Sequence, residues 1–157
     1  MRDVSQWQPE QRESASRPGR PARGETIALA LGRALFGGYF LYNGINHFLK
    51  RASLTQYARA KEVPAAPVAV PGSGLLLILG GLSLLTGRRP KLGAALITTF
   101  LVGVTPQMHA FWRTEGGERG QEFVNFMKNL ALVGGAALAA ANPEPWPLSA
   151  SARHRAA

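Results

Sequence analysis

Four long apolar segments, separated by short polar connections, dominate the pattern of residues along this chain. They run over 26–48, 68–85, 92–112 and 123–141. An α-helix rises about 1.5 Å per residue, so about 20 residues cross the roughly 30 Å hydrocarbon core of a bilayer. All four segments are close to that length. The pattern therefore predicts an all-α integral membrane protein, built as a bundle of four transmembrane helices.

The two ends of the chain differ in composition from these segments. Residues 1–25 are rich in Arg, Ser, Pro and Gly and have little to bury, which predicts a disordered basic N-terminal tail. Residues 142–157 begin with a Pro-rich stretch that stops the last helix, and they end in a basic tail. We expect Trp146, within that stretch, to lie at the level of the lipid headgroups. The transmembrane domain then covers residues 26–141.

The basic residues near the helix ends predict the orientation. With the N-terminus inside, nine lie on the cytoplasmic side and six on the other. The cytoplasmic set is Arg12, Arg17, Arg20, Arg23, Arg88, Arg89, Lys91, Arg153 and Arg155, and the opposite set is Lys50, Arg51, Arg59, Lys61, Arg113 and Arg119. Cytoplasmic flanks carry the excess of Lys and Arg. We therefore expect a multi-pass protein of the plasma (inner) membrane with both termini in the cytoplasm.

The overall charge changes this picture little. Lys and Arg number 18 and Asp and Glu 9, a formal net charge of +9. In a soluble protein this excess would suggest a nucleic-acid partner. Here the carboxylates all lie outside the apolar segments, and we expect membrane lipids, not nucleic acid, as partners. The chain has no Cys, which excludes disulfides, thiolate metal sites and thiol catalysis within it.

Small residues at every fourth position predict where helices approach closely. Ala30, Ala34 and Gly38 form one such row in the first segment, and Ala131, Gly135 and Ala139 form another in the fourth. Contacts within the bundle are favoured over a dimer face. The connection over 49–66 mixes apolar and basic residues, which indicates a short helix on the outer membrane surface.

Polar residues inside the apolar segments are the candidates for function, because polar groups are costly in hydrocarbon. In the predicted orientation they gather near the outer leaflet, and three helices contribute. The set is Asn43, His47, Gln107, His109, Trp112, Asn125, Lys128 and Asn129. Such convergence predicts a polar site. The alternative is that these residues cap helix ends, extend to the interface or satisfy loop backbone.

Arg33 is a separate intramembrane charge, about 10 Å into the first segment. No carboxylate lies in the apolar segments to pair with it. Its candidate partners are Thr98 or Thr99 of the third segment, a lipid phosphate, or another subunit. We favour extension of its side chain to the inner interface.

Two His residues on different helices raise the question of haem or metal. Both His47 and His109 lie near helix ends, so haem is disfavoured. A metal site is also disfavoured, because the nearest carboxylates, Glu115, Glu118 and Glu122, are expected in a loop. The chain has no P-loop, dinucleotide fingerprint, nucleophile elbow or zinc signature. No intrinsic cofactor is expected, and catalysis by the chain itself is left open.

Three patches of the sequence resemble the DoxX family of small four-helix membrane proteins. They are Gly32 to Phe48 (GRALFGGYFLYNGINHF), Gln107 to Trp112 (QMHAFW) and Phe126 to Gly135 (FMKNLALVGG). The resemblance covers about residues 27–141. Many members carry a Glu in the second helix before a pair of Gly residues. Here the stretch before Gly80-Gly81 has no carboxylate, so the resemblance does not extend to acid-dependent chemistry.

The resemblance implies a role in membrane redox chemistry. The family includes a small membrane subunit of a thiosulfate:quinone oxidoreductase and members linked to membrane redox complexes. We therefore expect a membrane subunit of an oxidoreductase system that interacts with quinone and with protein partners. The polar cluster would hydrogen-bond a quinone carbonyl, and His47 or His109 would handle its proton. The competing hypothesis is a non-catalytic membrane scaffold that assembles partner proteins.

Overall fold

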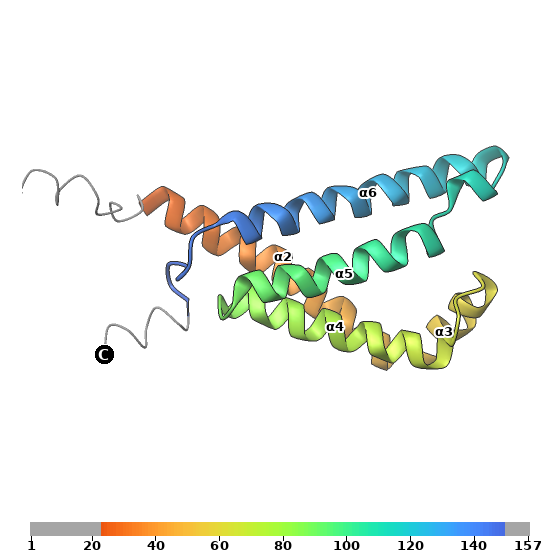
Figure 1. The fold of residues 1–157 in the computed structure, drawn as a ribbon, viewed down its shortest axis with the longest axis horizontal. Coiled ribbons are helices and arrows are strands. Elements are labelled where there is room, and N and C mark those ends of the chain that lie inside the picture. The colour runs from red at the N-terminus through yellow and green to blue at the C-terminus, as the bar shows by residue number, and fades with distance from the viewer. Residues whose placement is uncertain (1–22, 150–157) are drawn as a thin grey trace, which may run out of the picture.

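The computed structural model describes residues 23–149, and every regular element in that range is helical. The elements are α2 (Arg23–Leu49), α3 (Arg51–Ala60), α4 (Ala66–Thr86), α5 (Pro90–Met108), the 3₁₀ turn η1 (Phe111–Arg113) and α6 (Gly116–Ala141). The four long helices run along one axis, and α3 lies across one end (Figure 1). The all-α prediction is confirmed. The predicted tails lie outside the described residues, except for 23–25 and 142–149.

Helix α2 begins at Arg23, so the prediction of a disordered tail was wrong for residues 23–25. The helix bounds differ most from the predicted segments at two other places. Helix α6 begins at Gly116, seven residues before the predicted start, because its first two turns are polar and the apolar pattern starts only at Phe123. Glu118 and Glu122 therefore lie in a helix, and their assignment to a loop was wrong. Helix α5 ends at Met108, so Trp112 lies beyond it in η1. The short helix predicted within 49–66 is α3.

Three helices are long and apolar enough to cross a membrane. They are α4, α5 extended through η1 to Arg113, and α6. Helix α2 is 27 residues long but is not among them, and Arg33 and Asn43 lower its hydropathy. In the apolar part of α6 only 6% of residues are buried. Apolar surface of this extent is stable in contact with lipid and not with water.

Glycines bring α2 and α4 into backbone contact. A β-carbon on Gly37 would lie 2.8 Å from the backbone N of Leu85, and one on Gly81 would lie 2.6 Å from the backbone N of Leu41. Gly44 and Gly74 form a second contact of the same kind, two turns later in α2 and two turns earlier in α4, which runs antiparallel to it. Real β-carbons do not fit at such distances. The helices therefore pack through rows of glycines seven residues apart.

The predicted rows of small residues are only partly correct. A β-carbon on Gly38 would meet nothing within 4 Å, and Ala34 is exposed, so this row does not form the α2 contact. The contact row is displaced by one residue, to Gly37. The row in α6 is better placed, because a β-carbon on Gly135 would lie 2.9 Å from the Phe36 ring of α2. Next to Gly135, Ala136 is fully buried.

The connection between α4 and α5 is a tight turn. Gly87 ends α4 with a φ of +67°, a left-handed conformation that glycine adopts without strain. The Ser83 hydroxyl donates to the backbone carbonyls of Arg88 (2.7 Å) and Arg89 (2.9 Å). Beyond the turn, Gly80 and Gly93 allow α4 and α5 to pack closely, each against the backbone carbonyl of the other. The two helices thus form a hairpin.

The segment after α6 folds back over the end of the molecule that holds this turn. Trp146 is 1% exposed and belongs to the main hydrophobic core. Its predicted depth at the level of the lipid headgroups stays a prediction. Arg33 of α2 donates to the backbone carbonyls of Pro147 (3.2 Å) and Leu148 (2.9 Å). Its predicted partners, Thr98 and Thr99, are not the ones it contacts here. The guanidinium thus has hydrogen-bond acceptors that are close in space but distant in sequence.

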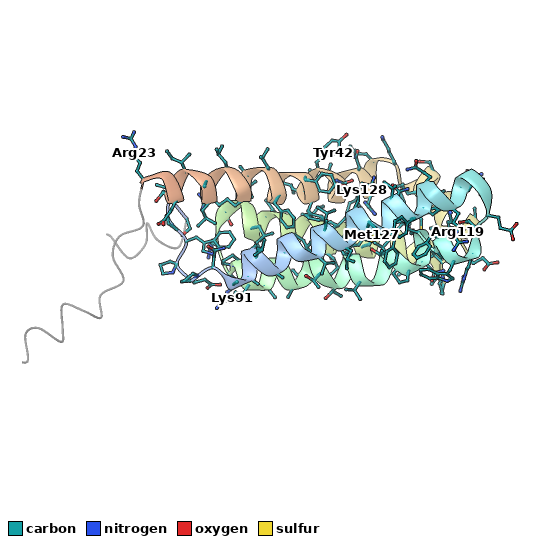
Figure 2. The ribbon with its side chains drawn as sticks, turned by 90° about the horizontal axis from the view of Figure 1, so that it is seen from above. Arg23, Tyr42, Lys91, Arg119, Met127 and Lys128 are labelled. Atoms are coloured by element: carbon teal, nitrogen blue, oxygen red, sulfur yellow. The ribbon has the colours of Figure 1, made fainter. Side chains whose placement is uncertain are left out.

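The two ends of the molecule differ in what they contain. Arg23 and Lys91 lie at one end of the long axis and Arg119 lies at the other (Figure 2). The first end, which we call the tail end, also holds residues 142–149. The second, which we call the α3 end, holds α3, η1 and the start of α6 (Figure 1). Both ends of the described chain therefore lie on the same side of the fold.

The neighbouring glycines Gly37 and Gly38 provide a direct test of this packing. Gly37→Ala should lower the free energy of unfolding by ~1–3 kcal/mol, because the added methyl group forces α2 away from α4. Gly38→Ala should be neutral or stabilising by up to ~1 kcal/mol, since it improves helix propensity at an open position. Thermal unfolding in mild detergent measures both. Equal stability of the two variants would contradict the described register.

Candidate functional site

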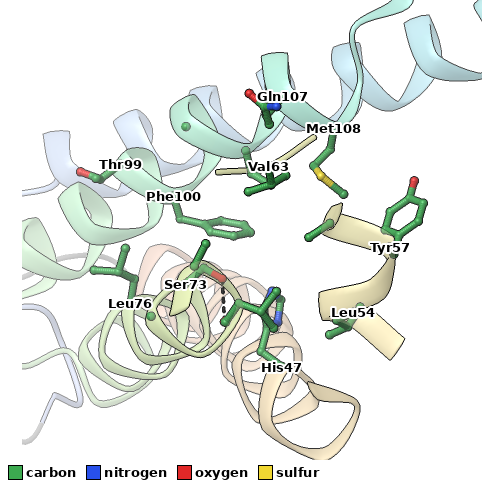
Figure 3. A pocket seen from close by; sticks show the side chains of 16 residues that line it. His47, Leu54, Tyr57, Val63, Ser73, Leu76, Thr99, Phe100, Gln107 and Met108 are labelled. Atoms are coloured by element: carbon green, nitrogen blue, oxygen red, sulfur yellow. Dashed lines mark hydrogen bonds between the residues drawn. The ribbon is translucent and has the colours of Figure 1, made fainter. Parts of the chain in front are cut away.

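A cavity of about 440 Å³ lies at the α3 end. Its walls come from the end of α2, from α3, from the start of α4 and from the end of α5. His47, Leu54, Tyr57, Phe100 and Gln107 surround a common space in Figure 3. The lining is almost entirely apolar. Ligand pockets with this character, and with a few polar groups that fix orientation, measure about 300–1,000 Å³. We call it the His47 cavity.

The His47 ring is held in one orientation. Its Nδ1 lies 2.7 Å from the backbone carbonyl O of Asn43. A carbonyl only accepts, so Nδ1 carries the proton of this bond. In the neutral ring Nε2 is then an acceptor, and within the described residues it has no hydrogen-bond partner. The ring also lies edge-on to Phe100 at 6.1 Å between centroids, which places it against α5.

Gln107 of α5 holds one wall of the cavity in place. Its Nε2 donates to the backbone carbonyls of Lys61 (3.2 Å) and Glu62 (3.3 Å), which ties α5 to the connection between α3 and α4. Both amide hydrogens are used, so the side-chain oxygen remains as an acceptor. Ser73, on α4, donates its hydroxyl to the Val70 carbonyl, as drawn in Figure 3. The cavity thus presents hydrogen-bond acceptors on otherwise apolar walls.

Asn43 does not contribute its side chain to the cavity. Its Nδ2 donates to the backbone carbonyl of Tyr39, one turn earlier in α2, at 2.8 Å. Asn43 acts instead through its own carbonyl, which orients His47. It is therefore a positioning residue for the His47 ring.

His109 forms a separate ionic cluster at the same end of the molecule. Its Nδ1 lies 2.7 Å from one oxygen of Glu122, and the Lys61 ammonium lies 2.7 Å from the other. These side chains are 14–30% exposed, with Glu122 the least exposed. The cluster joins the connection before α4, the end of α5 and the second turn of α6. We call it the Glu122 cluster.

The pKa of Lys61 is raised above its ordinary value. Its hydrogen bond to the Glu122 carboxylate is the main cause, and burial opposes it more weakly. A raised folded pKa stabilises the fold below the unfolded pKa and loses its effect only as the pH rises through the folded value. Lys61 therefore stays charged, and the pair stays intact, across neutral pH.

Trp112 lies in an aromatic cluster and not in the His47 cavity. Its ring packs edge-on against Phe111 (5.1 Å) and Phe126 (5.8 Å), and it is 52% exposed. Phe111 also contacts Phe123 of α6 at 5.2 Å. This cluster fixes η1 onto α6. Half-exposed aromatic rings at a helix end are typical of a membrane interface.

The predicted polar residues of α6 do not join the cavity. Asn125, Lys128 and Asn129 are absent from its lining. Asn125 accepts a long hydrogen bond from Gln121 at 3.5 Å, and Lys128 is exposed. The predicted set thus separates into the His47 cavity, the Glu122 cluster, the aromatic cluster of Trp112 and the polar residues of α6. The structure brings only His47 and Gln107 of this set into one cavity.

Two parts of the α3 end were not anticipated from the sequence. The first is the role of Glu122 and Lys61 as partners of His109. The second is the contribution of α3, whose Leu54, Tyr57 and Ala58 line the cavity.

A family model described as DoxX matches residues 28–110. The chain belongs to the DoxX family. This match includes α2 to α5, and hence all residues that line the His47 cavity, but it ends before Glu122 and Lys128. No curated protein and no solved structure shows a match. Together with the apolar helices, membership of the DoxX family identifies a multi-pass membrane protein.

The Glu122 cluster predicts a local effect on stability. Glu122→Gln should lower the free energy of unfolding by ~1–2 kcal/mol, because it leaves two partly buried donors without their anionic partner. Hydrogen exchange should also increase in the connection that holds Lys61. Glu118→Gln is the matched control, one turn earlier on the exposed surface of α6. If both variants are equally stable, the cluster does not hold this end together.

Proposed function

We propose that this DoxX protein is a membrane subunit of an oxidoreductase system and binds a quinone ring in the His47 cavity. The observation that supports this proposal is the cavity itself. It measures about 440 Å³, its walls are largely apolar, and His47, whose ring orientation is fixed, supplies a polar atom, Nε2. A quinone is a flat apolar ring with oxygens at its edges. Such a ring matches a pocket of this size that has few polar groups.

The orientation of His47 suits both redox states of that ligand. In the neutral ring, Nε2 accepts a hydrogen bond from a quinol hydroxyl. When the ring is protonated, Nε2 donates to a quinone carbonyl. Reduction of a quinone takes up two electrons and two protons, and His47 would exchange one of those protons with the ligand oxygen. In this proposal an electron-carrying partner protein supplies the two electrons, and water supplies the second proton.

The proposed arrangement in the membrane has four spans. Helix α2 is the fourth, because it is 27 residues long and packs along α4 through glycines. An even number of spans puts both ends of the chain on one side of the membrane, which agrees with both described ends lying at the tail end. In the sequence, the N-terminal flank, the α4–α5 turn and the C-terminal flank together carry the excess of Lys and Arg, which favours the cytoplasm, in the plasma membrane, for that side. The His47 cavity then opens in the outer half of the bilayer.

Reporter tags test this orientation. Tags at either terminus should report the cytoplasm, and tags inserted at Ser53 of α3 or Gly117 of α6 should report the far side. The physical reason is the retention of basic flanks on the cytoplasmic side. A terminus on the far side, or α3 on the same side as the termini, would contradict the four-span arrangement.

Ligand binding tests the proposed function. His47→Phe keeps a ring but removes both nitrogens, and it should weaken the binding of a quinol analogue by about tenfold, the loss of one good hydrogen bond. His109→Phe is the matched control at the same end, outside the cavity. Gly103→Leu should also block binding, because Gly103 lines the cavity and a β-carbon there meets nothing within 4 Å.

Equal binding by the wild type, His47→Phe and Gly103→Leu would contradict the quinone site. One observation then favours the scaffold function: Lys128 lies exposed within a candidate membrane span and has no described partner. An acidic side chain of a partner subunit would pair with it. Co-purification of a partner protein that is lost in Lys128→Leu would support that function.

A further inference from the structure

The polar groups that line the His47 cavity have already used their hydrogen-bond donors. The hydrogen of His47 Nδ1, both amide hydrogens of Gln107 and the hydroxyl hydrogen of Ser73 are all donated to backbone carbonyls. The backbone N–H of Val63, which also lines the cavity, is donated to the Ala58 carbonyl at 2.9 Å. What these residues have left to offer a ligand is therefore the ability to accept.

Three side-chain acceptor atoms remain, each from a different helix. They are Nε2 of His47 in α2, Oγ of Ser73 in α4 and the side-chain oxygen of Gln107 in α5. Within the described residues, Trp146 Nε1 is the buried side-chain nitrogen or oxygen that lacks a hydrogen bond. Nε2 of His47 and the Gln107 oxygen also lack one but are not buried, so a ligand can reach both. Because Nδ1 is turned back toward α2, Nε2 lies on the opposite edge of the ring.

The hydroxyl groups in the lining do not offset these acceptors. A hydroxyl both donates and accepts, so Thr99 can bond a ligand carbonyl or a ligand hydroxyl. Tyr57 is 47% exposed, and in Figure 3 its hydroxyl points away from His47. The described lining includes no Lys or Arg. Neither a hydroxyl nor a positive charge therefore favours a ligand that can only accept.

A quinol and a quinone differ in this respect. Quinol oxygens carry hydrogens to donate, whereas quinone oxygens are carbonyls and only accept. An acceptor that faces a carbonyl forms no hydrogen bond, and both groups lose water without compensation. On the basis of the proposed function, we propose that the His47 cavity binds the quinol more tightly than the quinone. The neutral ring of His47 distinguishes the two forms.

Such a preference sets the direction of the proposed chemistry. The quinone, two electrons and two protons give the quinol. A site that binds the reduced form more tightly raises the reduction potential of the bound couple, by about 30 mV for a tenfold ratio of dissociation constants in a two-electron reaction. The bound quinone is then a stronger oxidant than the free quinone. The class of reaction that supplies this site is therefore the oxidation of the electron-carrying partner.

Binding of the two redox forms to the full chain in mild detergent tests the proposal. The probe is a benzoquinone with a short alkyl chain, used either oxidised or as the quinol kept reduced by dithionite. The chain has no Cys, so the reductant leaves it unchanged. At about pH 8, where an imidazole is neutral, the dissociation constant of the quinol should be about tenfold lower, the effect of one good hydrogen bond. In a redox titration, excess protein should raise the midpoint potential of the probe by about 30 mV.

One variant and a matched control locate the preference. His47→Phe keeps a ring and removes the acceptor. It should weaken quinol binding about tenfold and change quinone binding by less than about twofold, so the ratio of the two constants falls toward one. Thr99→Val is the control, because it alters a hydroxyl of the same lining that does not distinguish the two forms. Its ratio should stay at the wild-type value or above it. Thermal unfolding confirms that both variants are folded.

The outcomes separate this inference from the proposed function. If the wild type binds neither form, the proposed function fails and this inference fails with it. If both forms bind and the quinone binds as tightly as the quinol, the quinone site stands and the preference is overturned. The preference is also overturned if folded His47→Phe keeps the wild-type ratio, because His47 then does not distinguish the two forms.

Discussion

The backbone contact between α2 and α4 is the constraint on which the rest of this structure depends. Glycines on both helices remove the side chains that would hold the helices apart. One consequence concerns His47 directly, because a β-carbon on Gly74 would lie 2.7 Å from the His47 Cβ. The side chain of His47 passes over that glycine and reaches Phe100 of α5. A bulkier residue at Gly74 would displace the ring from the cavity wall.

Each end of the molecule is then closed by a charged side chain with partners distant in sequence. At the tail end, Arg33 holds residues 147 and 148 against α2. At the α3 end, Glu122 binds both Lys61 and His109. In a membrane protein, helix packing lacks the hydrophobic driving force that water supplies. Polar contacts near the ends and close backbone packing between them are the interactions that remain.

The sequence predicts much of the fold, because apolar segments of membrane-spanning length form helices with few alternatives. It predicts the packing less well. The contact uses glycines seven residues apart, Gly37 and Gly44, and the predicted row at every fourth position, with Gly38, lies on the adjacent face. The burial of Trp146 in the core was not anticipated, because a Pro-rich segment carries no periodicity from which burial can be inferred.

The sequence predicted that these residues lie at one end of the bundle, but not which way their side chains point. His47, Gln107 and His109 all lie at one end, as their positions in the helices required. Which of them share a cavity depends on the rotation of each helix and on where α3 lies, and neither is encoded in a local pattern. Glu122 was missed as a partner of His109 because the apolar pattern of α6 begins one residue later, at Phe123.

Photo-cross-linking with a quinone that carries a light-activated group, followed by peptide mapping, is the most direct test of the central claim. The ring is small, so its adducts mark the residues that contact it. The account predicts adducts in α3 and in the segment of α5 around Phe100, and their loss when unlabelled quinone competes. Adducts spread over the outward face of α6, or adducts that excess quinone does not displace, would contradict a quinone site in the His47 cavity.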